Sequence, residues 1–411
     1  MRNIVFIGNS LAHAVAIDEI MRINSECALT LISSDACLSY SRSALMKMLS
    51  REIKEKQCLY RPEVFYKENK VRTVLGQTVT RINFKRSQIF LENKDHIAYD
   101  ILVLSDLAAP RFPEIKGHNK IGVYQSVQFS SVKEIIEQLV FAQTIVVEIN
   151  TWHGFSTLCG LSNYNKEIIA VTKNESLLPE VFDAESSSML KQILEYKGVR
   201  MMFNNPIDEI LGDSDLKAVR LKSGKVLSAE MVILDDLYCD TRIFKDSGFE
   251  KPQMNSENYE FQSNIPNVYW SDAIRNNFLH SRGCDYKETD AELERQGKSI
   301  ARTILGASEP VKGVQSINKF SFKDLQGVWF GQCGTSQDIN EFSRFFPETN
   351  TYAKIFCKDG FLFGGVLLNC QEAIDKIVEL YVNHTNIQGM EEQLFNEHLF
   401  QVSLSDAQQP G

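Results

Sequence analysis

Near the start of the chain, Gly8, Ser10 and His13 have the spacing of the G-x-G-x-x-G pattern. In that pattern, backbone N–H groups at the start of a helix hold the pyrophosphate of a dinucleotide, and the glycines let it approach closely. Only the first glycine is present here. The residues alone therefore leave two interpretations open: a nucleotide-binding turn, or an ordinary connection between a strand and a helix.

The elements that would position this turn form the pattern of a βαβ unit. Residues 3–7 are a short apolar run, typical of a strand that is buried on both faces. We expect a helix from the turn to about Asn24 and a second strand over residues 28–33. This arrangement places the glycine turn where a dinucleotide needs it.

Composition excludes several classes of protein. The 411 residues exceed what one hydrophobic core usually organises, so two or three domains are expected. The net charge of -9 argues against a nucleic-acid-binding protein, because phosphate neutralisation needs clustered Lys and Arg. No apolar run reaches the roughly 18 residues of a membrane span, and no leader pattern precedes the first strand. We therefore expect a cytoplasmic protein without a membrane span.

The cysteine pattern gives no support for a metal site. The chain has nine cysteines and no C-x-x-C pair, so an iron–sulfur cluster, a structural zinc site and a redox-active disulfide all lack their usual spacing. Reduced, scattered thiols are the simplest interpretation. Cys37, which follows the second predicted strand, is either one of these or a reactive thiol without a resolving partner nearby in sequence.

Three stretches resemble FAD-dependent pyridine nucleotide-disulfide oxidoreductases of the rubredoxin reductase and nitrite reductase large-subunit kind. Residues 31–47 resemble the run LISxE…LPYSRPxLSK of that family, which lies along the flavin. Residues 99–117 resemble YDxLVLATGAxPRFPxIPG, with Ser105-Asp106-Leu107 in place of Ala-Thr-Gly. Residues 267–274 resemble the family's DIYAAGDVA strand and keep its aspartate as Asp272.

The resemblance implies a set of residues that contact FAD. By matched position these are Gly8, Asn9 and Ser10 at the pyrophosphate, Ser34 and Asp35 at the adenosine ribose, Arg42 on the cofactor, Lys47 near the isoalloxazine, and Asp272 at the ribityl chain. Lys47 would be the catalytic residue, because a cation beside the flavin stabilises its reduced, anionic form.

A second βαβ pattern begins at residues 143–150, where the resemblance places the NAD(P)H site. Of the family's glycine-rich loop only Gly154 remains, and Thr172 stands where the ribose-binding acid is expected. Ile149, Thr151 and Trp152 carry side chains where the phosphates would need open backbone. We therefore expect NADH and NADPH to bind weakly or not at all. For Trp152 and His153, plain packing is favoured over a substrate role.

These patterns predict an α/β fold with two Rossmann-like domains of three layers each and a small α+β C-terminal domain. The FAD-type domain is expected at 1–117 and 240–306, the NAD(P)H-type domain at 118–239, and the C-terminal domain at 307–411. In the last of these, the turn 358–360 predicts a hairpin.

Three functions stay open at this point. The first is an FAD-dependent oxidoreductase that passes electrons to a protein or a small-molecule acceptor and has an altered electron donor. The second is a flavin-binding subunit that takes electrons only from a partner protein in a larger complex. The third is a scaffold subunit without cofactor. The substitutions that favour the scaffold are Ser10, His13, Asp106, Leu107 and Ser271. The electron donor, the acceptor and the oligomeric state are not determined by the sequence.

Overall fold

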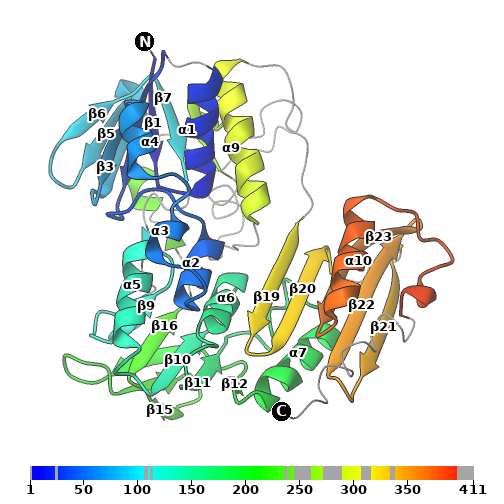
Figure 1. Ribbon diagram of the computed structural model, residues 1–411. Coiled ribbons are helices and arrows are strands. Elements are labelled where there is room, and N and C mark those ends of the chain that lie inside the picture. Colours follow the sequence, from blue (N-terminus) through cyan, green and yellow to red (C-terminus); the bar gives the residue numbers. More distant parts are fainter. Residues whose placement is uncertain are drawn as a thin grey trace. The chain divides into compact units, whose positions relative to one another are not determined.

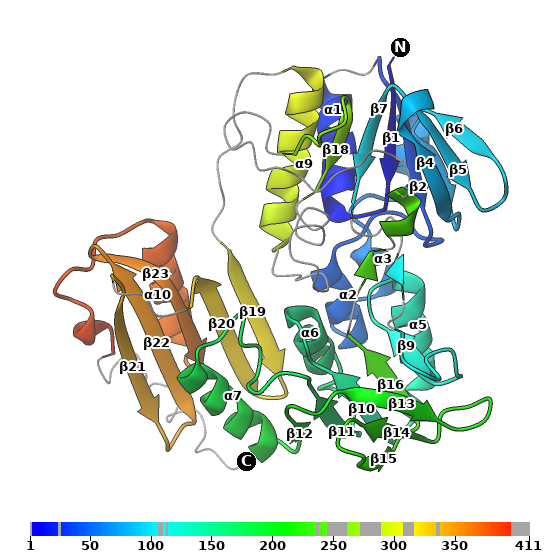
Figure 2. The ribbon, with the colours of Figure 1, turned by 180° about the vertical axis from the view of Figure 1, so that it is seen from behind.

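The computed structural model describes residues 2–23, 26–105, 110–111, 114–235, 238–239, 241–244, 261–271, 289–306, 316–333 and 338–395. The chain divides into two compact units (Figures 1 and 2). Unit 1 comprises Met1–Ala142, Gly212–Leu216 and Met231–Val314, and unit 2 comprises Gln143–Leu211, Lys217–Glu230 and Gln315–Gly411. The boundaries expected for three domains stay a prediction.

Unit 1 is built on a five-stranded sheet in which every pairing is parallel. In spatial order its strands are β18 (Val268–Trp270), β7 (Ile101–Leu104), β1 (Asn3–Ile7), β2 (Ala28–Ser33) and β3 (Arg72–Leu75). The strands predicted over residues 3–7 and 28–33 are confirmed. Every described residue of β7 is buried, because helices and loops cover both faces of a parallel sheet.

The parallel register brings several chain segments to one edge of this sheet. Four residues share the carboxyl edge of the sheet, because each comes directly after the last residue of a strand. They are Gly8, Ser34, Ser105 and Ser271. The strand order reverses between β1 and β7, since the chain leaves β1 toward β2 and returns on the other side. In open α/β sheets ligands bind at such a switch point.

Helices α1 (Leu11–Ile23) and α9 (Asp290–Leu305) pack side by side on the sheet (Figures 1 and 2). Gly297 allows their close approach, because a Cβ atom there would lie 2.4 Å from the carbonyl oxygen of Ala12 and 2.8 Å from Cβ of Val15. Helix α9 ends at Gly306, which has φ +72° and forms the left-handed cap typical of a glycine at a helix end.

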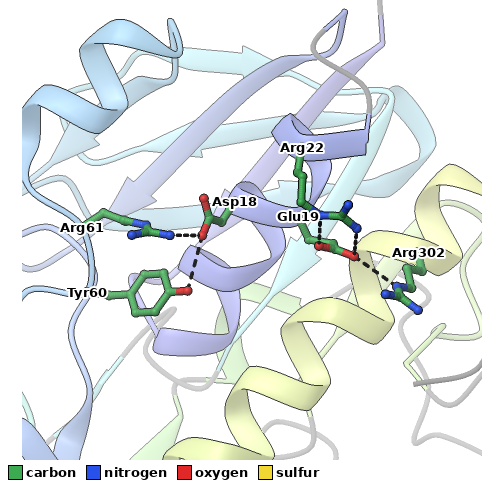
Figure 3. A network of polar contacts seen from close by, with 6 residues as sticks. All are labelled: Asp18, Glu19, Arg22, Tyr60, Arg61 and Arg302. Atoms are coloured by element: carbon green, nitrogen blue, oxygen red, sulfur yellow. Dashed lines mark hydrogen bonds and ion pairs between the residues drawn. The ribbon is translucent and has the colours of Figure 1, made fainter. Parts of the chain in front are cut away.

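An ion-pair network joins the same two helices near their other ends (Figure 3). Glu19 of α1 accepts hydrogen bonds from Arg22 at 2.8 Å and from Arg302 of α9 at 3.1 Å. The hydrogen bond from Arg22 contributes most to the shift that lowers the pKa of Glu19 to about 2. The bond from Arg302 adds to this shift, and burial opposes it. Asp18 accepts a hydrogen bond from Arg61 at 2.5 Å. The network ties α9 to the helix that begins at the glycine turn.

The remaining described elements of unit 1 are smaller. They are α2 (Arg42–Leu49), α3 (Glu55–Cys58), α4 (Glu63–Glu68), β4 (Val79–Asn83), η1 (Phe84–Arg86), β5 (Gln88–Leu91), β6 (His96–Ala98), β8 (Pro110–Arg111), β9 (Val123–Gln125), α5 (Phe129–Gln138), β16 (Met231–Leu234), β17 (Tyr238–Cys239) and η3 (Thr241–Phe244). The stretch 48–70 contains the short helices α3 and α4. Residues 96–104 form two strands instead of one continuous strand, because β6 pairs with β5 while β7 pairs with β1.

Unit 2 combines a second βαβ pattern with the C-terminal elements. Its elements are β10 (Thr144–Glu148), α6 (Trp152–Gly160), β11 (Glu167–Val171), α7 (Ala184–Tyr196), β12 (Arg200–Met202), β13 (Ile207–Leu211), β14 (Ala218–Leu221), β15 (Val226–Ser228), β19 (Ile317–Phe322), β20 (Leu325–Gly331), β21 (Asn340–Phe346), β22 (Thr351–Lys358), β23 (Phe361–Leu368), α10 (Gln371–Val382) and η4 (Glu392–Phe395). Strands β10, β11 and β12 pair in parallel, and the C-terminal strands form an antiparallel sheet of order β19-β20-β23-β22-β21.

The predicted hairpin turn in the C-terminal sheet is confirmed. Asp359 and Gly360 have φ angles of 52° and 80°, as a two-residue turn with a right-handed strand twist requires. Strand β21, which was not expected, lies at the sheet edge and exposes most of its side chains. Each helix in the described part of the chain is too short or too polar to cross a lipid bilayer.

We predict that Gly297→Ala destabilises the protein even though alanine favours a helix by about 1 kcal/mol. The added Cβ would collide with backbone of α1, and such overpacking costs about 1–3 kcal/mol. Urea unfolding measures the difference, with the exposed neighbour Lys298→Ala as a control that changes stability little. A Gly297→Ala variant as stable as the parent would contradict the close packing of α1 and α9.

We also predict that Glu19→Gln lowers the free energy of unfolding at pH 7 by about 1–3 kcal/mol, because hydrogen bonds to a charged group are lost. The folded-state pKa lies below the ordinary value of 4.5, so the parent loses this stabilisation as pH falls from about 4.5 toward 2. The two proteins should then converge. Glu63→Gln, in an exposed pair with Lys67, is the control and should change little at any pH.

Candidate functional site

The glycine turn of unit 1 keeps the backbone that a dinucleotide-binding turn needs. Gly8 has φ +99°, where any other residue would be strained, and its N–H donates to the carbonyl of Ile32 at 2.8 Å. Ser10 precedes α1, and its Oγ accepts from the N–H of His13 at 3.4 Å. The Asn9 side chain donates to the carbonyl of Cys37 at 2.9 Å, which fixes the turn against the end of β2.

His13 stands where the pattern has its third glycine. Its ring is fully buried, lies edge-on to Phe6 at 5.2 Å, and contacts the Gly8 carbonyl through Nδ1 at 2.7 Å. Burial lowers the pKa of His13 to about 4, although the carbonyls of Gly8 and Leu104 oppose the shift. The imidazole is therefore neutral at pH 7. In the sequence His13 is only a departure from the glycine pattern. In the structure its ring supports the turn, because it packs against Phe6 and contacts the carbonyl of Gly8.

Ser34 and Asp35, predicted at the adenosine ribose, are joined to the start of α5. Oδ2 of Asp35 accepts from the hydroxyl of Tyr40 at 3.0 Å and from the N–H of Phe129 at 2.8 Å. Gln128, the residue before α5, makes no side-chain cap to its own helix and donates instead to Ser34 Oγ at 3.3 Å. Asp35 thus caps α5 from a position 94 residues earlier in the chain.

Two polar atoms at the carboxyl edge have no hydrogen-bond partner within the described part of the structure. They are Oδ1 of Asp35, whose residue is 3% exposed, and Oγ of Ser271, whose residue is 1% exposed. A buried polar atom without a hydrogen-bond partner costs free energy. Such atoms are therefore often found where a polar ligand binds. The edge therefore has unused hydrogen-bonding capacity beside the turn.

The other predicted cofactor contacts are placed as follows. Arg42 begins α2 and is half-buried, while Lys47 is exposed on the same helix. Ser41 caps this helix by accepting from the N–H of Ala44 at 3.0 Å. Asp272 lies outside the described residues, as do Asp106 and Leu107.

The described cysteines are free thiols, and burial disfavours the thiolate form of Cys37 and Cys58. Burial raises the pKa of Cys37 to about 12, assisted by the charge of Asp35, and burial raises the pKa of Cys58 to about 11. Both thiols are protonated at neutral pH, so a reactive role for Cys37 is not supported. In the part of the chain that the structure describes, no group of His, Cys, Asp and Glu is suited to a metal ion.

The corresponding loop of unit 2 uses its hydrogen-bonding groups internally. Thr151 caps α6, its Oγ1 accepting from the N–H groups of His153 at 3.2 Å and Gly154 at 3.5 Å. Asn150 Oδ1 accepts from the hydroxyl of Thr172 at 3.2 Å, so the residue in place of the ribose-binding acid is also engaged. Thr151 has φ -128°, and residues 149–152 all avoid the left-handed region. The loop has the geometry of an ordinary strand-to-helix connection.

The bulky residues of this loop lie in the interior. Ile149 is 0% and Trp152 is 8% exposed, and Trp152 contacts other aromatic rings. The interpretation of Trp152 as a packing residue is thus confirmed. The start of α6 is capped by Thr151, whose Oγ1 is the acceptor for two of the helix's own N–H groups.

Two Rossmann-like βαβ patterns, the first with a glycine turn at a switch point, define a fold of the dinucleotide-binding class. A model of the pyridine nucleotide-disulphide oxidoreductase family matches residues 2–271, and the chain belongs to that family.

The chain is similar to known reductases along most of its length. It is 23% identical over 372 residues to nitrite reductase [NAD(P)H] of Bacillus subtilis (strain 168), covering 89% of this chain and 45% of that protein. It is 20% identical over 398 residues to the assimilatory nitrate reductase electron transfer subunit of the same strain, covering 96% and 51%. The chain thus spans about half the length of these curated relatives.

Solved structures share the fold at low sequence identity. The covalent putidaredoxin reductase–putidaredoxin complex aligns with a TM-score of 0.78 at 15% identity, covering 99% of both chains. Reduced Bacillus anthracis CoADR-RHD aligns with a TM-score of 0.77 at 17% identity, covering 95% of this chain and 76% of that one. The α/β fold with Rossmann-like domains is therefore confirmed.

We predict that Asp35→Ala lowers the free energy of unfolding by about 1–3 kcal/mol, because the Tyr40 hydroxyl loses its acceptor and the Phe129 N–H keeps only its bond to the Tyr40 hydroxyl at 3.1 Å. Tyr40→Phe is the matched control and should cost less, since Phe129 keeps its bond to Asp35. Urea unfolding of the three proteins measures this. Equal stability of Asp35→Ala and the parent would show that Asp35 does not cap α5.

Proposed function

We propose that the chain binds FAD in unit 1 and acts as an electron-transfer oxidoreductase whose flavin is reduced by a donor other than NAD(P)H. The observation that carries this proposal is the contrast between the two loops. Gly8 keeps φ +99° at an edge where Asp35 Oδ1 and Ser271 Oγ have no partner among the described residues. The cap of α1 is one long bond from the N–H of His13 to Ser10, whereas Thr151 accepts from two N–H groups of α6.

The residues at the carboxyl edge fit FAD. Oδ1 of Asp35 is buried and free to accept a hydrogen bond, as a ribose hydroxyl would offer. The turn at Gly8 gives the backbone of Asn9 and Ser10 the position at a helix start that suits a pyrophosphate. When bound, FAD accepts electrons in pairs and releases them singly.

The chain's own residues would bind and tune the cofactor. In this proposal Ser34 and Asp35 hold the ribose, and Arg42 and Asp272 hold the rest of the cofactor in an extended form. Lys47 is placed near the isoalloxazine, where its positive charge favours the reduced, anionic flavin. The exposure of Lys47 in α2 supports this role, because the side chain is available to a neighbouring group.

A protein or a small molecule receives the electrons in this proposal. The names of two similar proteins, an electron transfer subunit and a reductase in complex with putidaredoxin, support a protein partner. A cytoplasmic location is part of the proposal, supported by the free thiols of the described cysteines.

A scaffold without cofactor is the second candidate. It is favoured by the burial of the turn, since Asn9 and Ser10 are both buried and the Asn9 side chain is bonded to the chain itself. In this case unit 1 keeps the family's fold while its edge is filled by protein atoms.

The absorption spectrum of the purified protein separates the two candidates. We predict flavin bands at about 375 and 450 nm, with FAD released as the free cofactor on denaturation. Reconstitution of the apoprotein with FAD should restore the same bands. A protein that shows no such bands, and takes up no FAD, is the scaffold.

We predict that millimolar NADH or NADPH does not bleach the bound flavin in stopped-flow mixing, because the start of α6 is capped by Thr151. Dithionite should reduce the same sample, which serves as the control that the flavin is accessible to electrons. Fast, saturable bleaching at about 450 nm by either nucleotide would restore an ordinary NAD(P)H reductase.

A further inference from the structure

Within unit 2, the first residue of α6 is held in a cluster of aromatic rings from the C-terminal sheet. The ring of Trp152 lies edge-on to Phe320 of β19 at 5.7 Å and to Trp329 of β20 at 5.4 Å. Phe155, one turn further along α6, is edge-on to Phe320 at 5.1 Å. These edge-to-face distances are in the favourable range for aromatic pairs. Strand β19 thus packs against α6 (Figure 1).

The C-terminal sheet is shaped for this contact. Phe320 faces Gly327 on the neighbouring strand, and a Cβ atom at Gly327 would lie 2.2 Å from the Phe320 ring. The missing side chain leaves the space in which that ring lies. Phe320 can therefore contact both aromatic residues of α6 from a strand position.

A buried cation makes a second connection, between the start of α7 and the same sheet. Lys354 of β22 has a side chain that is only 5% exposed. It is bonded to Asp183, which caps α7, to Glu185 at 3.1 Å and to Glu341 of β21 at 2.9 Å. Tyr352 and Ser186 share a further hydrogen bond at 3.3 Å. A buried ion that loses its partners is strongly destabilising, so these contacts hold the two segments together.

We propose that the start of α6 serves as the docking site of the chain's own C-terminal sheet, with Trp152 as its anchor. The second βαβ segment and the C-terminal sheet then form one cooperative folding unit, in which the βαβ segment supports the C-terminal sheet instead of binding a second nucleotide. This inference rests on the proposed function, in which NAD(P)H is not the electron donor, and it assigns a structural role to the second βαβ segment.

Elementary chemistry explains why one role excludes the other. A pyrophosphate that binds at a helix start needs backbone N–H groups that have no other partner. These groups must replace the water molecules that the pyrophosphate loses on binding. At α6 the first N–H groups are used by Thr151, and the side chain next to them is an indole buried among rings. Docking of apolar rings at that place removes water that a charged ligand would require.

The test is hydrogen–deuterium exchange of the full chain with substitutions at Trp152. In Trp152→Ala we expect amides of β19 and β20 to exchange at least about tenfold faster, because docking is weakened. Trp152→Phe keeps a ring and should restore most of the protection. Leu31→Ala, a buried residue of β2 in unit 1, is the matched control for general destabilisation, because it lies outside the proposed folding unit.

The outcomes test the docking role of Trp152 and the proposal on the electron donor separately. If β19 and β20 keep their protection in Trp152→Ala, or lose it equally in Leu31→Ala, the docking role of Trp152 is overturned, whatever the flavin measurements give. If the protection is lost selectively while NADH reduces the flavin, the docking role of Trp152 stands, but the exclusion of a nucleotide from α6 is overturned together with the donor proposal.

Discussion

The parallel pairing of β1 with a strand on each side is the constraint on which unit 1 depends. Because β2, β7 and β18 all run in the same direction as β1, segments from four distant parts of the chain end at one edge. That edge holds Gly8, Asp35 and Ser271. A slip of one residue in the register would turn buried side chains to the wrong face, so the register is strongly specified.

The two βαβ patterns show how one local change alters what a shared fold can do. In unit 1 a glycine with positive φ precedes α1, and Ser10 Oγ accepts from one N–H group of that helix, at 3.4 Å. In unit 2 Thr151 adopts an extended conformation and its hydroxyl satisfies the N–H groups of α6. The sheet and the helix are the same kind of structure in both. The difference lies in which atoms complete the helix start.

Membership of the oxidoreductase family fixes the architecture, while the chemistry rests on a few positions. The buried, neutral His13 and the joint between Asp35 and α5 are features of this chain that bear directly on its nucleotide edge. In unit 2 aromatic and ionic contacts join α6 and α7 to the C-terminal sheet. Unit 1 thus carries the glycine turn, and unit 2 carries a βαβ segment packed against the C-terminal sheet.

The sequence by itself determined the strands β1 and β2, the end of α9 at Gly306 and the hairpin at Asp359, because these depend on local periodicity and on residues that tolerate positive φ. It could not show that Asp35 caps a helix 94 residues later, or that Trp152 meets Trp329. Contacts between such distant residues depend on how whole elements pack. Only the tertiary structure decided them, since hydrogen-bonding and burial energies are realised only when the partners are brought together.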